Sequence, residues 1–574
     1  MAKYKHYDYS QDVLIPVSLK DQLMPGTLEF AIHHLLETRM DTSIFDDRYN
    51  NDETGRWAYD PKVLLKVVLF GYSRGLTSSR DLEKACRENV TFMALACGQK
   101  PDHSTIAAFV SSMKVEILPL FRDVLLVCDE EGLLGGTFFA LDGCKLPSNA
   151  SRRWSGRISD LKRKKEKIEK KVEQLLEQQV DEDNKDDDEQ EGGGSSGISD
   201  ENKQIEKLQK QAERIEKFLK ENAPKIGKQG REIRSNVTDN ESAMMVSSHG
   251  TLQGYNGQAL VDSKHQVIVH GGAFGSGEDE HYLIGPMLDG AKENMRSIGK
   301  GEDYFAGKTF TADSNYHSPT NLKKCDKEHL DAYVPDKRFR NRDPKFEDGK
   351  RRRRRKRKRF SLDDFHYDEA TDQYRCPDGK TLRLNTKRAV VDGVVYRRYL
   401  ANRDECETCE LKAKCLQGKN IKGRLLNVPV GSVPGHLTKL MAAKIDTEQG
   451  RRVYDQRAGI VEPVFANIRF HKSMDRFTLR GKIKVNIQWL LYCMVHNLEK
   501  IVNYGFSQQG SIKGSRERWL EAGQREKARF KTYRTRFSTK ARERQPGSTA
   551  KPVPHAIFFD SLQINQKCLG EIRI

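Results

Sequence analysis

Residues 137–143 read Thr-Phe-Phe-Ala-Leu-Asp-Gly, a short apolar run that ends in the carboxylate of Asp142. Gly135 and Gly136 precede the run and Gly143 follows it, and a brief apolar run bounded by glycines is typical of a buried β-strand. We expect Asp142 to stand where this strand leaves the sheet. A carboxylate there must be exposed, paired with a cation or bound to a metal. The alternative is an Asp that caps the next turn.

A second run has the same form. Residues 308–313 read Lys-Thr-Phe-Thr-Ala-Asp and predict a strand that ends at Asp313, ahead of a helix that begins near Ser318 and Pro319. Two strands that each end in Asp can bring both carboxylates to one edge of a sheet, and hard divalent cations prefer oxygen ligands. The pair therefore indicates a metal site formed by Asp142 and Asp313.

A third acid lies in a predicted helix over residues 451–469. The apolar stripe of this helix consists of Val453, Ile460, Val461, Val464, Phe465 and Ile468. Glu462 falls within the stripe, and a Glu that faces the core is costly unless it meets a cation. We therefore expect Glu462 to complete the metal site, the alternative being a Glu on the flank of the stripe.

These three motifs, in this order, resemble the Asp-Asp-Glu constellation of DDE transposases from bacterial insertion sequences, and the resemblance extends to about Asn503. It implies that Asp142, Asp313 and Glu462 hold two Mg²⁺ (or Mn²⁺) ions. The activity it implies is metal-dependent cleavage at the ends of the element, followed by transfer of the freed 3′-hydroxyl into target DNA. The implied partner is double-stranded DNA, bound by a homodimer.

The helix that carries Glu462 also resembles the Tyr-Arg-Glu-Lys signature of one large transposase superfamily. The matching residues are Tyr454, Arg457, Glu462 and Arg469, and the resemblance implies that Tyr454, Arg457 and Arg469 bind DNA phosphates. Two departures are present: four residues rather than three separate Arg457 from Glu462, and Arg469 stands where Lys is usual.

The expected fold class is α/β, with an RNase H-like mixed sheet and helices, a helical-hairpin insertion, a Cys-rich β insertion and an all-α N-terminal domain. Strands at 254–262 and 265–270, a helix at 280–292, a strand at 332–335 and an apolar helix at 487–497 fit that order. The expected segments are a helical domain for DNA binding or dimerisation (1–134), a first RNase H-like segment (135–157), a helical hairpin with a disordered acidic tip (158–229), a second RNase H-like segment (230–335), a basic arm with a zinc-ribbon-like insertion (336–450), a third RNase H-like segment (451–504) and a basic tail (505–574).

Helical patterns at 61–71, 78–86 and 105–113 fill the N-terminal region. They fit a helix-turn-helix-like DNA-binding module and an ordinary helical bundle equally well.

Further along the chain, two sets of apolar positions follow a heptad spacing and predict an antiparallel hairpin. Its positions are Ile158, Leu161, Lys165, Ile168, Val172 and Leu175 in one helix, and Ile205, Leu208, Ala212, Ile215 and Leu219 in the other. The intervening residues 181–197 are acidic and then rich in Gly and Ser, which predicts disorder. The hairpin is either an arm for dimer or DNA contact or a solvated spacer.

Four cysteines lie around a predicted β-hairpin whose type I′ turn is Asp392-Gly393. They are Cys376, Cys406, Cys409 and Cys415. Their grouping predicts one structural Zn²⁺ held by four thiolates. The alternative is four buried thiols.

The chain of 574 residues carries 100 Lys and Arg against 82 Asp and Glu, a formal net charge of +18. Lys350–Arg359 is an unbroken run of basic residues, and the tail from residue 505 mixes basic residues with aromatic ones such as Trp519 and Phe530. This balance suggests a polyanionic partner, although a protein that only associates non-specifically with polyanions would carry the same net charge. The polar N-terminus and the lack of an apolar run near the ~20 residues that span a bilayer predict a cytoplasmic, nucleoid-associated protein with no membrane partner.

Two other functions remain open from the sequence. One is a metal-dependent DNA nuclease without strand transfer, since the chemistry of cutting is shared. The other is a non-catalytic, zinc-containing DNA-binding protein derived from a transposase.

Overall fold

The computed structural model describes residues 17–49, 57–186, 195–227, 230, 232–247, 250–346, 360, 362–391, 394–416, 423–429 and 434–505. The basic run Lys350–Arg359, the predicted turn at 392–393 and the basic tail from residue 506 lie outside the described residues.

A mixed sheet surrounds the strand that carries Asp142. Its strands are β1 (Phe138–Pro147), β4 (Ala243–Ser247), β5 (Gly250–Asp262), β6 (Ile268–Phe274), β7 (Thr309–Ala312) and β8 (Asp331–Tyr333). Their order is β4-β5-β1-β7-β8, and β6 also pairs with β5. Strand β1 runs antiparallel to β5 and parallel to β7, and β7 runs parallel to β8. The centre of β1 is fully buried because Phe139, Ala140 and Leu141 pack on both faces of the sheet.

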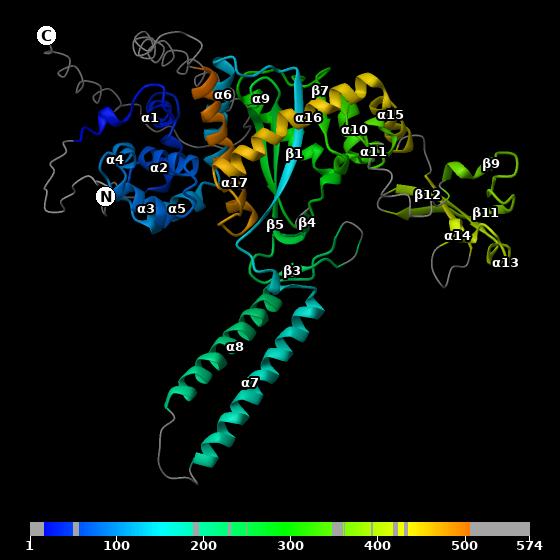
Figure 1. Ribbon diagram of the computed structural model, residues 1–574, viewed down its shortest axis with the longest axis horizontal. Coiled ribbons are helices and arrows are strands. Elements are labelled where there is room, and N and C mark those ends of the chain that lie inside the picture. The colour runs from blue at the N-terminus through cyan, green and yellow to red at the C-terminus, as the bar shows by residue number, and fades with distance from the viewer. Residues whose placement is uncertain are drawn as a thin grey trace, which may run out of the picture. The chain divides into compact units, whose positions relative to one another are not determined.

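Helices cover both faces of this sheet (Figure 1). The helical elements in this part of the chain are η4 (Glu280–Tyr282), α9 (Ile284–Ser297), η5 (Ser314–Tyr316), α10 (Pro319–Lys327), α11 (Phe339–Arg342), η6 (Pro344–Phe346), α15 (Pro434–Asp446), α16 (Glu448–Ala466), η8 (Asn467–His471), α17 (Lys482–Lys500) and η9 (Ile501–Gly505), of which α9, α15, α16 and α17 contact strands of the sheet. On strand β6, Gly271 lies against Trp489 of α17, whereas its neighbour His270 lies against Gly290 of α9. Because side chains alternate along a strand, α17 and α9 lie on opposite faces.

Helix α17 also joins the sheet to the N-terminal helices, so the apolar core is continuous between them. The N-terminal elements are η1 (Lys20–Gln22), α1 (Leu28–Thr38), η2 (Ser43–Arg48), α2 (Pro61–Ser73), α3 (Ser79–Glu88), α4 (Val90–Leu95), α5 (His103–Ser112) and α6 (Ile117–Glu130). Side-chain oxygens of Asp60, Ser78 and Asp102 cap α2, α3 and α5, which explains where those helices begin. In the described part of the chain no one helix is long and apolar enough to cross a membrane; α5 and α6 reach that length and apolarity together, with a bend of 82° between them.

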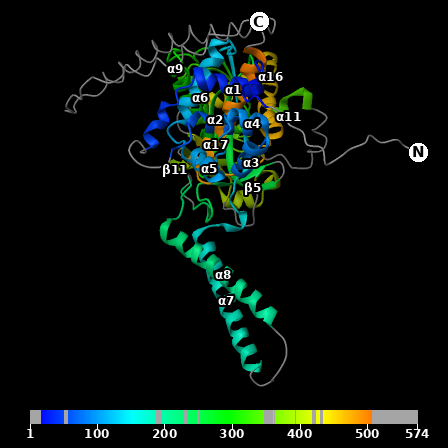
Figure 2. The ribbon, with the colours of Figure 1, turned by 90° about the vertical axis from the view of Figure 1, so that its left-hand side faces the viewer.

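Helices α7 (Ile158–Asp186) and α8 (Ser195–Glu221) lie side by side (Figures 1 and 2). Lys165 pairs with Glu216, and Gln179 hydrogen bonds to Asn202, a spacing that fits an antiparallel pair. At the base of the pair, η3 (Arg152–Trp154), β2 (Ser155–Gly156) and β3 (Ser235–Asn236) connect it to the sheet. The helices extend further into residues 181–197 than the composition predicted, because adding a residue to a helix that is already packed gains one hydrogen bond at little further ordering cost.

The cysteines lie around a separate antiparallel sheet in the order β13-β12-β11-β10-β9. Its elements are η7 (Leu362–Asp364), β9 (His366–Asp368), β10 (Gln373–Arg375), β11 (Thr381–Val391), β12 (Val394–Ala401), α13 (Arg403–Glu407), α14 (Lys412–Cys415) and β13 (Leu425–Pro429). The pairing of β11 with β12 runs up to Val391 and Val394, as the predicted hairpin requires.

Candidate active site

The register of β1 and β7 brings the first two predicted acids together. Leu141 of β1 pairs with Ala312 of β7 in the parallel register. The residue that follows Leu141 is Asp142, and the residue that follows Ala312 is Asp313, so the two acids are neighbours. Strand β7 ends there, because the Asp313 side chain accepts a hydrogen bond from Asn315 N and caps η5. The sequence predicted that strand β1 ends at Asp142. Instead the strand continues to Pro147, because it stays paired with β5. Asp142 therefore marks the end of the β1–β7 pairing rather than the end of the strand.

Asp142 is held by two donors. Its Oδ2 accepts a hydrogen bond from Arg457 Nη1 at 2.8 Å, and its Oδ1 accepts one from Gly143 N at 2.8 Å. Burial raises the pKa of Asp142 above its usual range, Arg457 and Gly143 N act against that rise, and the charge of Asp313 adds to it. Arg457 stays charged: burial acts to lower its pKa, but the carboxylate of Asp142 raises it above the usual value. The pair is therefore an ion pair in a crowded acidic environment.

The opposite face of β1 holds a polar cradle next to Gly143. An added Cβ at Gly143 would lie 2.0 Å from Gln258 Nε2 and 2.6 Å from Asn256 Oδ1. Both side chains come from β5 and are buried, and within the described residues neither of those two atoms has a hydrogen-bond partner. Gly143 thus leaves the space that these two amides occupy.

Two residues near Asp313 were missed by the sequence analysis. Tyr316 is fully buried, and its hydroxyl donates to Gln258 Oε1. Burial raises the pKa of Tyr316 well above its usual value, and the nearby charges of Asp142, Glu280 and Asp313 add to the rise. Glu280 on η4 is the second missed residue: burial raises its pKa, the charge of Lys145 acts to lower it, and Asp313 adds to the rise.

The contacts of Glu280 explain why no sequence pattern pointed to it. Its Oε1 accepts a hydrogen bond from Asn256 Nδ2 at 2.9 Å and lies 3.6 Å from Lys145 Nζ. Glu280 comes close to Asp313 because η4 packs on η5, with His281 Nδ1 2.6 Å from the carbonyl oxygen of Asn315. This is a tertiary contact between two short helical turns, which carry no periodic signal.

Helix α16 has the predicted apolar stripe, but Glu462 lies outside it. Val461, Val464 and Ile468 are fully buried, whereas Glu462 is exposed. The expectation that Glu462 faces the core is therefore wrong, and the alternative, a position on the flank, describes its place. With 3.6 residues per turn, Val461, Val464 and Phe465 fall on the buried side of the helix, and Glu462 and Pro463 fall on the exposed side.

The other residues of the Tyr-Arg-Glu-Lys-like signature lie along the same helix and its continuation. The Tyr454 ring packs edge-on against Phe339, with their centroids 5.3 Å apart, and the Arg457 guanidinium lies 5.8 Å from the Tyr454 ring centroid. Arg469 lies in η8, a turn of π-helix that continues α16. Its Nε atom is buried and has no hydrogen-bond partner among the described residues.

The oxygen donors of Asp142 and Asp313 fit a hard divalent cation. Carboxylate oxygens are the ligands that Mg²⁺ and Mn²⁺ prefer, and a bound cation would offset the charge of Asp313 that adds to the pKa rise of Asp142. Among the described residues, however, no three His, Cys, Asp or Glu side chains are already grouped to hold a metal ion. Glu462 is therefore not grouped with the two aspartates in this structure.

The predicted zinc site finds no support. Cys415 is buried in a small core that contains Leu382 and Tyr399, Cys376 and Cys406 pack against this core, and Cys409 is half-buried. Burial raises the pKa of Cys415, Arg424 acts to lower it, and the other three cysteines add to the rise, so the thiols are neighbours. Among the described residues, these cysteines do not form a group that could hold a metal ion. The Cys409 thiol instead donates to Asp378 Oδ2 at 3.3 Å, and the Cys376 sulfur accepts from Lys380 N at 3.3 Å.

Two protein-family models match the chain. The model described as Transposase DDE domain matches residues 375–502, which include Arg457, Glu462 and Arg469. The model described as Transposase domain (DUF772) matches residues 17–112, from η1 to the end of α5. A search of curated proteins found no match. The transposase models matched in two separate stretches of the chain indicate a DDE-type transposase of the insertion-sequence kind.

Proposed function

We propose that this transposase cuts DNA at the ends of its insertion sequence and joins the freed ends to target DNA. Asp142, Asp313 and Glu462 would be the catalytic carboxylates that hold the Mg²⁺ or Mn²⁺ ions. The observation that carries the proposal is the parallel pairing of β1 with β7, which brings Asp142 and Asp313 side by side. The order of elements around them (β1, β5, β6, α9, β7, α10, β8 and, much later, α16) supports the RNase H-like fold that the sequence resemblance implied.

Bound Mg²⁺ or Mn²⁺ would supply the Lewis acidity that activates a water or 3′-hydroxyl and stabilises the leaving oxygen. The chain's own groups position the acids. Gly143 N and Arg457 orient the Asp142 carboxylate, and Asn315 N orients that of Asp313. Arg457 also neutralises Asp142 in the structure, which keeps the acidic pair stable while the third acid, Glu462, is turned to solvent.

The basic residues of α16 and η8 suit the DNA backbone. The unpartnered, buried Nε of Arg469 is a donor that a phosphate oxygen would satisfy, and a buried donor without a partner is costly to keep. Arg457 has a guanidinium with several donors, so it could hold Asp142 and a phosphate together. We assign phosphate binding to both arginines and a packing role on Phe339 to Tyr454.

The test is a Mg²⁺-dependent cleavage and strand-joining assay on DNA that carries the ends of the element. Asp142→Asn, Asp313→Asn and Glu462→Gln each remove one charge with little change of shape. Each should abolish both cutting and joining, and the losses should be strongly non-additive because the three acids act as one metal holder. If any of the three variants cuts at the wild-type rate, that residue is not a ligand.

Two controls make the result specific. Glu448 is an exposed acid at the start of the same helix and forms an ion pair with Arg452. Glu448→Gln should leave cleavage unchanged. DNA binding, measured in parallel, should persist in all the variants because it depends on basic surfaces. Cutting by the wild-type protein without any joined product would favour a nuclease without strand transfer.

A further inference from the structure

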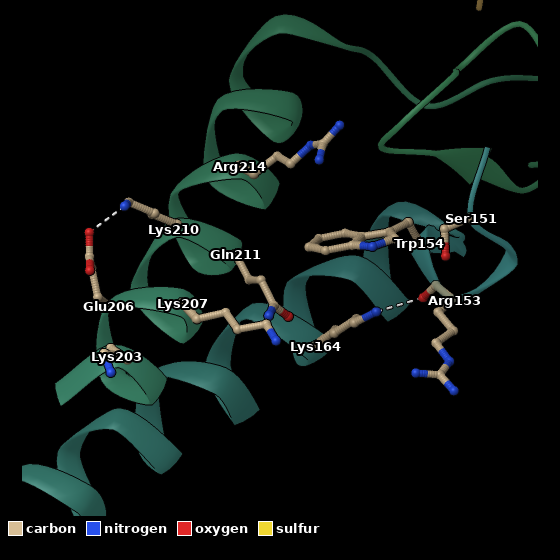
Figure 3. A pocket seen from close by; sticks show the side chains of 10 residues that line it. All are labelled: Ser151, Arg153, Trp154, Lys164, Lys203, Glu206, Lys207, Lys210, Gln211 and Arg214. Carbon is tan, nitrogen blue, oxygen red and sulfur yellow. Dashed lines mark hydrogen bonds and ion pairs between the residues drawn. The ribbon is translucent and has the colours of Figure 1, made fainter. Parts of the chain in front are cut away.

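A basic groove lies at the base of the α7–α8 hairpin (Figure 3). Its volume is about 660 Å³, and its walls come from α8, the start of α7 and residues 151–154. The cationic side chains that line it are Arg153, Lys164, Lys203, Lys207, Lys210 and Arg214. The one acidic lining residue is Glu206, which is paired with Lys210. The groove therefore has a strong excess of positive charge.

The cations of α8 form a stripe along one face of that helix. Residues 203, 207, 210 and 214 are spaced by four, three and four positions, which puts them on the same side. At 1.5 Å per residue the stripe is about 16 Å long, about the length that five phosphates of one DNA strand cover along the duplex axis. Two other lysines of the same helix, Lys217 and Lys220, do not line the groove. Lys217 Nζ lies 3.9 Å from Glu221 Oε1, and Lys220 Nζ lies 2.8 Å from Glu216 Oε1.

Trp154 fixes two of these cations in place. Lys164 Nζ lies 4.7 Å and the Arg214 guanidinium 5.6 Å from the centroid of the indole ring, and the ring itself packs against the small core around Leu161 and Ile215. Lys164 Nζ also donates to the carbonyl oxygen of Arg153 at 2.6 Å. Figure 3 shows Lys164 and Lys207 extending from the two helices toward the space beside this ring. Side chains that are ordered before binding lose less entropy when a ligand arrives.

The gathering of like charge is costly without an anion. Burial lowers the pKa of Lys164, and the charge of Arg153 lowers it further. Such a cluster persists on a surface where a polyanion screens it. A groove that is long, open and lined by lysine and arginine suits a phosphate chain better than an apolar partner.

We propose that this groove binds the backbone phosphates of duplex DNA, which makes the α7–α8 hairpin a DNA-binding arm separate from the carboxylate site. The inference rests on the proposed function in that the DNA is the transposase's own substrate. Binding through phosphates carries no base sequence, so the arm would position DNA for the catalytic site without selecting its sequence.

The experiment compares two double variants of the full chain that lose the same charge. Lys203→Gln/Lys207→Gln removes two cations from the groove, and Lys217→Gln/Lys220→Gln removes two from the same helix outside it. Affinity for a fluorescently labelled random duplex is measured by anisotropy over a range of salt concentrations. The groove variant should reduce the slope of log K against log salt by about 1.8, and its affinity at 0.15 M salt should fall on the order of 30-fold. The control variant should change the slope by less than half as much.

A second measurement uses the wild-type protein, so it does not depend on the folding of a variant. DNA should protect Lys203 and Lys207 from acetylation by an amine reagent and leave Lys217 and Lys220 reactive, as read by mass spectrometry. Equal slopes for the two variants, or equal protection of the two lysine pairs, would overturn the inference. So would a groove variant that loses self-association in sedimentation while it keeps its DNA affinity, since the groove would then be a contact between copies of the chain.

Wild-type cleavage, assayed beside these measurements, separates the two proposals. If the wild-type protein cuts DNA and the groove variant binds normally, the groove inference fails and the proposed function stands. If the wild-type protein binds DNA through the groove but neither cuts nor joins it, the proposed function fails and the groove inference stands.

Discussion

Replacing Gly143 by Ala tests whether the polar cradle beside β1 supports the candidate active site. The new Cβ would lie 2.0 Å from Gln258 Nε2 and 2.6 Å from Asn256 Oδ1, far inside van der Waals contact. Both clashing atoms are side-chain ends, but neither is free to swing away. Gln258 is fully buried and accepts the hydrogen bond of Tyr316, and Asn256 is buried and donates to Glu280.

The expected cost follows from these contacts. Forcing an extra methyl group into a packed interior costs about 1–3 kcal/mol. Separating Gln258 from the Tyr316 hydroxyl adds about 1 kcal/mol for the lost hydrogen bond. The free energy of unfolding should therefore fall by about 2–4 kcal/mol, a shift of roughly 30- to 1,000-fold in the folded-to-unfolded ratio. Because Tyr316 ends the turn that Asp313 caps, cleavage should fall as well.

The measurement is urea denaturation of the variant beside the wild-type protein, with the Mg²⁺-dependent cleavage assay on the same samples. Gly285→Ala is the matched control: Gly285 lies in α9, and no atom outside its own helix lies within 4 Å of the added Cβ. That change should be neutral or stabilise by up to about 1 kcal/mol. If Gly143→Ala unfolds at the same urea concentration as the wild type and the control, the cradle does not constrain this strand.

Two further predictions concern other regions of the fold. His496 is buried, with Nε2 2.9 Å from the carbonyl oxygen of Gln266 and Nδ1 3.1 Å from Asn467 Nδ2, and burial lowers its pKa to about 3. As the pH falls, the histidine of the unfolded chain takes up a proton before His496 of the folded protein does. The contribution of His496 to the free energy of unfolding should therefore be full above about pH 6.5 and should decrease as the pH drops toward 3. Denaturation curves taken at several pH values should show a weaker pH dependence for His496→Gln. Ile215→Ala, in the core between α7 and α8, should cost about 2–5 kcal/mol within the hairpin and leave cleavage of short DNA ends intact; unchanged hydrogen exchange in α7 and α8 would contradict this.

The sequence predicted those features of the site that local patterns encode. The runs before Asp142 and Asp313 are short and apolar, each ends at an Asp, and each forms a strand of the same sheet. The apolar stripe of α16 and the buried helix α17 follow from periodicity in the same way. Gly143 was interpreted as the end of a strand because glycine usually weakens one. Here it lies within β1 and makes room for Gln258, a role that depends on the neighbouring strand.

The features that the sequence did not reveal depend on contacts between distant segments. Glu280 and Tyr316 reach the site through the packing of η4 on η5, and neither lies in a periodic pattern. The orientation of Glu462 was predicted wrongly for another reason. A stripe several residues wide has edges, and spacing cannot tell whether a polar residue at such an edge faces the core or the solvent.

The pairing of Asp142 with Arg457 has a consequence for how the protein is made. The two residues are 315 positions apart in the chain. At roughly 5–20 residues per second, a ribosome needs about 15–60 s to pass from one to the other. Strand β1 and its partners β5 and β7 can pair in that interval, so the nascent sheet carries two adjacent carboxylates before the arginine that neutralises one of them has been synthesised. A chain that terminates before α16 would keep those two carboxylates without this counter-ion, and quality-control proteases would meet a sheet whose acidic edge is uncovered.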